Sequence, residues 1–164
     1  MISHTVFKND TLEQSIDHFP RFALDEQLAL LWKMRSYFEA AVRTTAADES
    51  DTFARNLFEN IQGKSFEEQC ECLQDIASNE NTQLSREYGA LYTDKKLVFW
   101  HLIGRGVEEG SIAPLPEDYH LSPPAQEFLQ ALEEANATEK LALLRCVVET
   151  LGVNPMASAV FSVP

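Results

Sequence analysis

The sequence predicts an all-α fold, and three observations support that prediction. Apolar residues recur every three or four positions through most of the chain, which is the spacing of one face of an α-helix. No segment alternates apolar and polar residues with the period of two that a half-buried strand shows. Residues that typically begin or end helices stand between the periodic segments, so we expect about eight short-linked helices packed as bundles.

Two helices are expected before residue 45. Asp10 or Thr11 can cap a short helix that ends near Phe19, because a side-chain oxygen there can accept a hydrogen bond from the first turn. Asp25 opens a longer periodic segment that continues to about Arg43. The uninterrupted pattern predicts one continuous helix for that segment.

Two further helices are expected between residues 46 and 80. The acidic segment 46–62 keeps the helical period and is followed by Gly63, a residue type common at helix C-termini. Ser65 and Glu68 have the spacing of a capping box, in which each side chain bonds the other residue's backbone N–H. This pair predicts the start of a helix that carries two of the three cysteines.

Two more helices are expected in the middle of the chain. Thr82 or Ser85 begins one that ends near Leu91. Thr93 caps the next, an apolar helix with one tryptophan that ends at Gly110. Two glutamates near the end of that helix oppose the helix dipole, and nothing in the sequence explains them.

The last helices follow a proline-bracketed connection. Residues 112–121 are the longest well-marked loop, and we expect this loop to cross between two subdomains. Ser122 followed by Pro123 predicts a helix start, since proline is tolerated in the first turn. A final helix is expected over residues 137–151, before Gly152.

Composition and charge limit the classes of function. The 164 residues suit one domain, expected over residues 1–152, and the apolar tail 153–164 has no helical period. The formal net charge of −13 repels phosphate backbones and anionic lipids, so no nucleic acid partner is expected. No apolar run approaches the roughly 20 residues that span a bilayer, and no secretory signal is recognisable. We therefore expect a soluble cytoplasmic protein.

The three cysteines do not form a recognisable site. An odd number is unlike the disulfide framework of a small secreted protein. On one helix, Cys70 and Cys72 would lie about 200° apart and could not hold one metal ion together. Buried thiols are the favoured interpretation. An alternative is a redox-active or intermolecular disulfide through Cys70, Cys72 or Cys146, which would couple a homodimer to the redox state.

Catalytic signatures are absent from the sequence. It contains no nucleophile elbow, zinc-protease motif, glycine-rich phosphate loop or paired-cysteine motif, and none of its four histidines stands at a metal-ligand spacing from another histidine or cysteine. We therefore do not expect an enzyme. Two helical stripes instead mix large aromatic with small or polar residues, which suits either a groove for a flat ligand or an ordinary core. The stripes are Leu28, Leu31, Trp32 and Arg35, and then Leu97, Trp100, His101, Gly104 and Val107.

Four segments resemble one known family. They read DEQLALLW (25–32), KLVFWHLIGRG (96–106), APLPEDYHLS (113–122) and LLRCVVETLG (143–152). In this order and at nearly this spacing they resemble the all-helical N-terminal domain of the orange carotenoid protein and its stand-alone relatives, the helical carotenoid proteins of cyanobacteria. The resemblance runs from about Ile16 to Gly152. It implies two interleaved four-helix subdomains with a keto-carotenoid, such as canthaxanthin or echinenone, bound non-covalently between them.

The resemblance also implies which residues hold the pigment. Trp32 and Trp100 match two family tryptophans that suit stacking on a conjugated ring. Arg145 matches a surface arginine that meets a C-terminal domain or the light-harvesting antenna in two-domain relatives. The implied pigment-binding set is Leu28, Leu31, Trp32, Arg35, Leu73, Leu97, Trp100, His101, Val107, Leu115, Pro116, Leu141, Arg145 and Val148.

The sequence departs from the family at four positions. Arg35 and His101 stand where tyrosines are usual, Val98 replaces a glycine, and Asp94 replaces an asparagine. The implied function is a soluble carotenoid carrier that quenches singlet oxygen. One alternative is quenching of the phycobilisome antenna by direct docking through Arg145. Another is a pigment-free helical interaction module, which Arg35 and Val98 favour.

Overall fold

The computed structural model describes residues 16–45, 51–116 and 118–153, and within these ranges it confirms the all-α prediction. No strand occurs in the described ranges. The elements, in chain order, are the 3₁₀ helix η1 (Phe19–Arg21) and the α-helices α3 (Leu24–Lys33), α4 (Arg35–Thr44), α5 (Thr52–Gln62), α6 (Phe66–Ala77), α7 (Gln83–Gly89), α8 (Thr93–Glu109), α9 (Pro123–Glu134) and α10 (Ala137–Glu149).

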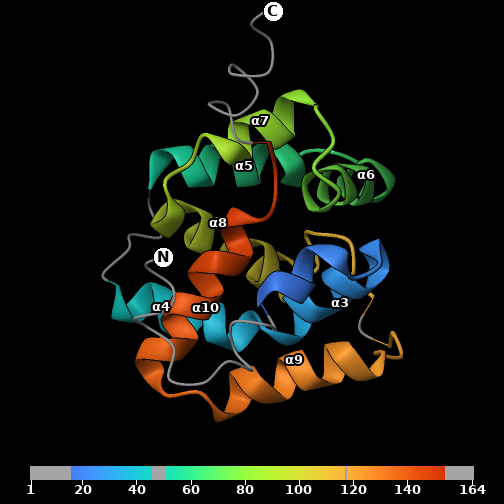
Figure 1. The fold of residues 1–164 in the computed structure, drawn as a ribbon. Helices are drawn as coiled ribbons and strands as arrows, with labels where there is room; N and C mark the ends of the chain where they lie inside the picture. The colour runs from blue at the N-terminus through green and yellow to red at the C-terminus, as the bar shows by residue number, and fades with distance from the viewer. Residues whose placement is uncertain (1–15, 46–50, 117, 154–164) are drawn as a thin grey trace, which may run out of the picture.

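The helices form two groups that share one central helix (Figure 1). Helices α5, α6 and α7 pack against one another on one side, and α3, α4, α9 and α10 form the other side. Helix α8 lies between the groups and contacts α4, α5 and α10. This arrangement agrees with the two interleaved subdomains that the sequence resemblance implied.

The residues directly after α10 hold the two groups together. After α10, the Gly152 N–H donates to the Ile76 carbonyl at 2.8 Å, and the Val153 N–H donates to the Ser85 carbonyl at 3.1 Å. Gly152 has a φ of +74° and lies directly against the Tyr88 ring and the Ser85 carbonyl, so a side chain at position 152 would collide with both. The segment after α10 therefore anchors one helix group onto α6 and α7 of the other.

The predicted continuous helix from Asp25 to Arg43 is wrong. The helix breaks at Met34, which has φ −89° and ψ 1° and is fully buried, so that α3 and α4 are separate helices. The Arg35 guanidinium donates to the Trp32 carbonyl at 2.9 Å. This bond satisfies a carbonyl near the end of α3 that regular helical pairing would otherwise take.

Of two predicted helix starts in the first half, one is corrected and one is confirmed. The segment 46–62 begins its helix only at Thr52, because the Asp51 carboxylate accepts the Ala54 N–H at 3.0 Å and caps it there. Residues 46–50 lie outside the described ranges. Gly63 follows α5 as predicted, and both halves of the Ser65–Glu68 capping box form at 3.2 Å.

Helix ends in the second half follow the sequence closely, with one exception. Thr82, and not Ser85, caps α7, and Gly110 ends α8 with a φ of +86°. The exception is Thr93, which is the first residue of α8 and not its cap; its hydroxyl instead donates to Glu149 of α10 at 2.8 Å. Helix α10 ends two residues before the predicted 151.

The predicted N-terminal helix and C-terminal tail lie largely outside the described residues. Of the predicted helix ending near Phe19, residues 16–18 are helical and Phe19 begins a 3₁₀ turn. Residues 154–164 are not described.

Candidate functional site

Trp100, in the middle of α8, is the more deeply buried of the two tryptophans. Its side chain is 2 % exposed, and its indole N–H donates to the Tyr88 hydroxyl at 2.8 Å. Tyr88, on α7, in turn donates to the Val148 carbonyl of α10 at 2.8 Å. Burial raises the pKa of Tyr88 well above its ordinary value, so the phenol stays protonated and keeps donating. This chain of bonds fixes the indole relative to two other helices.

The rings around Trp100 meet edge to face. Phe99 lies 5.1 Å from the Trp100 ring at 80°, and Tyr88 lies 6.1 Å from it at 68°. Edge-to-face contacts of this kind fill a core without stacking the aromatic faces. Tyr88 has no special signal in the sequence, and its place at the centre of this cluster was not predicted.

Trp32, at the end of α3, lies in the same core but is covered by a charged group. Its ring centre is 4.0 Å from the guanidinium carbon of Arg35, a cation–π contact. Arg35 also pairs with Glu108 of α8, with Nε 3.3 Å from the carboxylate. This pair gives a structural reason for one of the two glutamates that oppose the α8 dipole.

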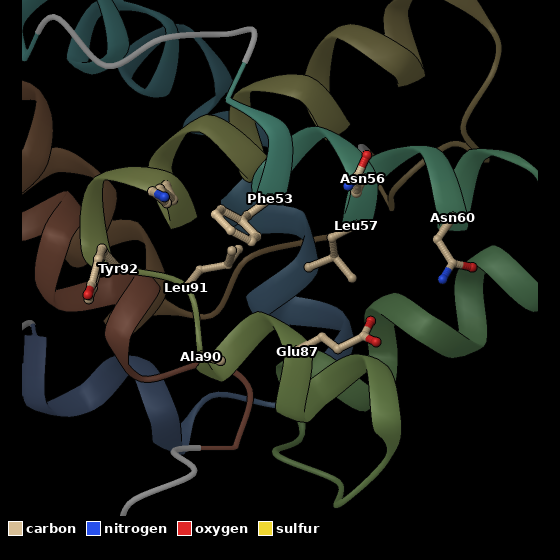
Figure 2. Close-up of a pocket in the computed structure, with 9 residues that line it drawn as sticks. Phe53, Asn56, Leu57, Asn60, Glu87, Ala90, Leu91 and Tyr92 are labelled. Atoms are coloured by element: carbon tan, nitrogen blue, oxygen red, sulfur yellow. The ribbon is translucent and has the colours of Figure 1, made fainter.

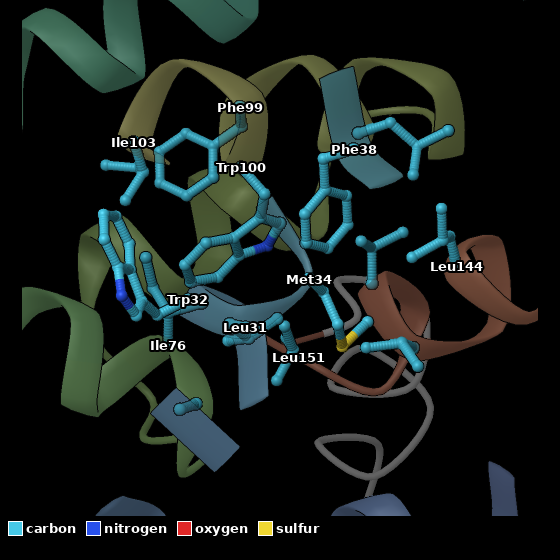
Figure 3. Close-up of a cluster of buried hydrophobic side chains, with 14 of the residues drawn as sticks. Leu31, Trp32, Met34, Phe38, Ile76, Phe99, Trp100, Ile103, Leu144 and Leu151 are labelled. Atoms are coloured by element: carbon cyan, nitrogen blue, oxygen red, sulfur yellow. The ribbon is translucent and has the colours of Figure 1, made fainter. Parts of the chain in front are cut away.

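The structure brings most residues of the implied pigment-binding set into one buried cluster. Figure 3 shows both indoles within it, beside Phe99 and Ile103. The other members of the set in this cluster are Leu28, Leu31, Leu73, Leu97, Leu115 and Val148. Val107 and Leu141 are partly buried and pack against the cluster, and Pro116 is half-buried beside Leu115. An apolar set of this kind is thus assembled from α3, α6, α8, α10 and the loop after α8.

A small polar cavity of about 350 Å³ lies at the α4–α8 junction. His101 is buried there, and its Nε2 lies 2.8 Å from Nη2 of Arg105. The side chains that line the cavity are Lys33, Arg35, Ser36, Glu39, His101, Gly104, Arg105 and Glu108. Arg35 and His101, two of the sequence departures, therefore lie together at one place.

Leu141 and Arg145 lie on α10, away from that cavity. Leu141 lines a small space of about 100 Å³ between α4 and α10. Arg145 is half-exposed, and its Nε and Nη2 donate to the Asp94 carboxylate at 3.2 and 3.1 Å. The Asp94 departure thus supplies a partner for Arg145 within the chain. The remaining departure, Val98, is fully buried in the core.

An exposed groove of about 570 Å³ was not predicted from the sequence (Figure 2). It lies between α5, α7 and the start of α8, with Leu57 and Leu91 toward its floor. Phe53 and Tyr92 are the aromatic residues at its edge, 65 % and 79 % exposed. Lys95 lies 4.5 Å from the Phe53 ring and pairs with Asp51 at 3.3 Å. Nothing in the sequence distinguished this groove from an ordinary helix surface.

The cysteines are placed differently from the prediction that all three are buried. Cys70 is exposed, because it stands one position after the buried Gln69 and so lies about 100° around α6. Cys72 and Cys146 are partly buried, and burial raises the pKa of both thiols. All three are free thiols in the structure. Within the described part of the chain, no three histidine, cysteine or carboxylate side chains are grouped as a metal site would require.

None of the helices in the described ranges has the length and apolar character needed to cross a lipid bilayer.

Comparisons with known proteins identify the fold and the family. The family model described as "Orange carotenoid protein, N-terminal" matches residues 5–154. A Nostoc sp. "Orange carotenoid-binding domain-containing protein" is 32 % identical over 149 residues, covering 90 % of this chain and 87 % of the relative. The "Orange carotenoid-binding protein" of Synechocystis sp. is 30 % identical, covering 87 % of this chain and 45 % of the relative. The chain therefore spans about half the length of that longer protein.

Solved structures agree with these matches. The Anabaena (Nostoc) sp. PCC 7120 Red Carotenoid Protein binding canthaxanthin has a TM-score of 0.74 at 30 % identity, covering 87 % of this chain and 99 % of that one. The Orange Carotenoid Protein of the same organism, binding canthaxanthin, has a TM-score of 0.72 at 26 % identity, covering 89 % of this chain and 48 % of that one. The family is one of carotenoid-binding proteins and not of enzymes. This chain belongs to the family of the orange carotenoid protein N-terminal domain.

Proposed function

We propose that this chain is a carotenoid carrier that protects its surroundings by quenching singlet oxygen. One observation carries the proposal: both tryptophans and six further members of the implied set share one buried apolar cluster. A long polyene needs such surroundings, because each Å² of apolar area removed from water contributes about 25 cal/mol. We place its action in the cytoplasm, and the net charge of −13 favours solubility there.

The side chains present fit a keto-carotenoid. Leu28, Leu73 and Leu97 offer saturated apolar surface from three helices, and none of them needs a hydrogen-bond partner. Trp32 and Trp100 add two large indole rings, whose faces suit contact with a conjugated ring. We infer non-covalent binding, since the set contains no serine or cysteine nucleophile and no lysine that could form a Schiff base.

The protein's task on this proposal is binding and protection, without proton or group transfer. A bound keto-carotenoid would accept the excitation energy of singlet oxygen and release it as heat. The chain holds the pigment away from water, and the Trp100–Tyr88–Val148 hydrogen bonds fix one of the indoles beside it. Redox or acid–base groups are not needed for this activity.

A purified sample tests the proposal directly. The chain is produced in cells that make canthaxanthin, and its visible absorption is followed through size-exclusion chromatography. We expect a red-shifted carotenoid band that co-elutes with the protein. The pigmented protein should then shorten the lifetime of singlet-oxygen phosphorescence more than the same concentration of colourless protein. A colourless, folded protein would support the pigment-free interaction module instead, and a pigmented protein without faster decay would overturn the quenching role.

Docking to the phycobilisome antenna is the second proposed function, and Arg145 is the residue on which it depends. Arg145 is half-exposed in a shallow surface depression beside Tyr92 and Cys146. The carboxylate of Asp94 already accepts two of its N–H groups, so an antenna carboxylate would have to compete with Asp94. We therefore favour the first function. Asp94→Asn should increase quenching of phycobilisome fluorescence if docking occurs through Arg145, and unchanged fluorescence would argue against docking there.

A further inference from the structure

Three contacts orient the Arg35 guanidinium. Its guanidinium carbon lies 4.0 Å from the Trp32 ring centre, Nη1 donates to the Trp32 carbonyl at 2.9 Å, and Nε lies 3.3 Å from Glu108. Arginine has five N–H donors in a fixed plane, and the two polar contacts engage Nη1 and Nε. Among the described residues, the Nη2 group is left for another acceptor. The guanidinium is therefore oriented before any ligand arrives.

The cavity beside Arg35 favours an acceptor oxygen. Lys33 and Arg105 also line this space of about 350 Å³. Its two carboxylates already have partners, since Glu39 accepts from Arg43 at 2.7 Å and Glu108 pairs with Arg35. In a chain with a net charge of −13, this is a local concentration of cationic donors next to an indole.

We propose that Arg35 reads the end group of the pigment, favouring an end ring with a conjugated keto oxygen over an unsubstituted hydrocarbon ring. This inference rests on the proposed function. The guanidinium face can stay on Trp32 while its Nη2 edge donates to the keto oxygen. A hydrocarbon ring at the same place would shield the Nη2 N–H groups of Arg35 from water and give them no acceptor, which is costly for a charged group. The selectivity thus comes mainly from rejection of the hydrocarbon ring.

A competition experiment tests the proposal. The colourless full chain is incubated with phosphatidylcholine vesicles that contain equal amounts of canthaxanthin and β-carotene, and the pigments retained on the protein are extracted and quantified. We expect canthaxanthin to be enriched about tenfold in the unaltered chain, as a charged hydrogen bond can provide. Arg35→Leu should bring the ratio close to one, and Arg35→Lys should give an intermediate ratio. Arg86→Leu is the control, because Arg86 is an exposed arginine of α7 that does not line this cavity.

The visible band gives a second, independent measurement. A hydrogen bond that polarises the keto group should shift the canthaxanthin band to the red, so Arg35→Leu should move that band to the blue. The β-carotene band should stay in place in both proteins. Equal pigment ratios and equal bands in the unaltered chain and Arg35→Leu would overturn the role of Arg35 while leaving pigment binding intact. If the unaltered chain retains neither pigment, the proposed function itself fails.

Discussion

The two tryptophans of this chain lie in one core but in opposite surroundings. Trp100 is enclosed by aromatic rings, and its N–H begins a neutral hydrogen-bond chain through Tyr88 to Val148. Trp32 is at the end of a helix and is covered by Arg35, which is bound to the exposed Glu108.

This difference separates a fixed position from an adaptable one. Moving the Trp100 ring requires breaking buried hydrogen bonds that have no water to replace them. The group that covers Trp32 is held by a half-exposed ion pair, which contributes little to stability and can exchange partners. We expect the Trp100 side to set the geometry of the core and the Trp32 side to set selectivity.

Truncation of the two indoles should show the largest difference. Trp100→Ala leaves a cavity in the core and should lower the free energy of unfolding by about 3–5 kcal/mol. Trp32→Ala should lower the free energy of unfolding by less, because Arg35 can move into the space that the indole leaves and the cavity beside Arg35 is already polar. Urea denaturation measures both, with Phe53→Ala as an exposed aromatic control within about 0.5 kcal/mol of the unaltered chain.

The same two substitutions can also be tested for their effect on pigment retention. If Trp100→Ala is too unstable to purify, Trp100→Phe removes the N–H and part of the ring with a smaller cavity. The double variant Trp32→Ala and Trp100→Ala should lose pigment retention altogether. Equal losses of stability in the two single variants would contradict the distinction between a fixed and an adaptable side.

Removal of one hydroxyl should have the next largest effect. Tyr88→Phe keeps the ring but leaves the Trp100 N–H without its acceptor and removes one of two donors from the Val148 carbonyl, which keeps the Leu151 N–H at 3.4 Å. The free energy of unfolding should fall by about 1–3 kcal/mol, the cost of leaving a buried polar group unpaired. Tyr92→Phe is the matched control, since Tyr92 is exposed on the neighbouring turn, and urea denaturation should show no change for it. An unchanged free energy of unfolding in Tyr88→Phe would mean that the hydrogen-bond chain does not fix Trp100.

The contrast between the two tryptophans also shows what could be inferred from the sequence. Helical spacing placed Leu28, Leu31 and Trp32 on one buried face, because that spacing depends only on local geometry. The break at Met34 was missed, since no residue pattern marks it and the bond from Arg35 to the Trp32 carbonyl that accompanies it has no pattern of its own.

Contacts between distant segments were the other features that the sequence could not supply. The bond from Trp100 to Tyr88 joins α8 to α7, and the bond from Tyr88 to Val148 joins residues 60 positions apart. The pairing of Arg35 with Glu108 likewise depends on how α4 crosses α8. Patterns along one helix predict its buried face, but the partners of a polar group on that face depend on the packing of the whole domain.

Alkaline pH should separate the two sides by a smaller effect. Burial raises the pKa of Tyr88 in the folded protein, whereas in the unfolded chain it ionises near the ordinary value of about 10. Tyr88 therefore contributes its full stability below about pH 10, and this is lost as pH rises further, by at most about 1.4 kcal/mol per pH unit. Tyr88→Phe should show a shallower decline in urea denaturation between pH 9 and about 11. The thiols of Cys72 and Cys146 act in the same direction but equally in both proteins. Parallel curves would show that the Tyr88 proton is not protected by burial.

The smallest expected effect concerns the ion pair that holds Arg35 over Trp32. Glu108→Gln should change the free energy of unfolding by less than about 1 kcal/mol, because both partners are substantially exposed to water. It should nevertheless alter the emission of Trp32, measured with Trp100→Phe so that only one indole emits, because the guanidinium would lose one of its three contacts. Glu109→Gln is the control, as Glu109 is an exposed neighbour on the same turn. The emission difference between the two variants should shrink in about 1 M salt, where exposed pairs are screened. A loss of stability as large as that of Tyr88→Phe would mean that the Trp32 side is as rigid as the Trp100 side, and would contradict the distinction between a fixed and an adaptable side.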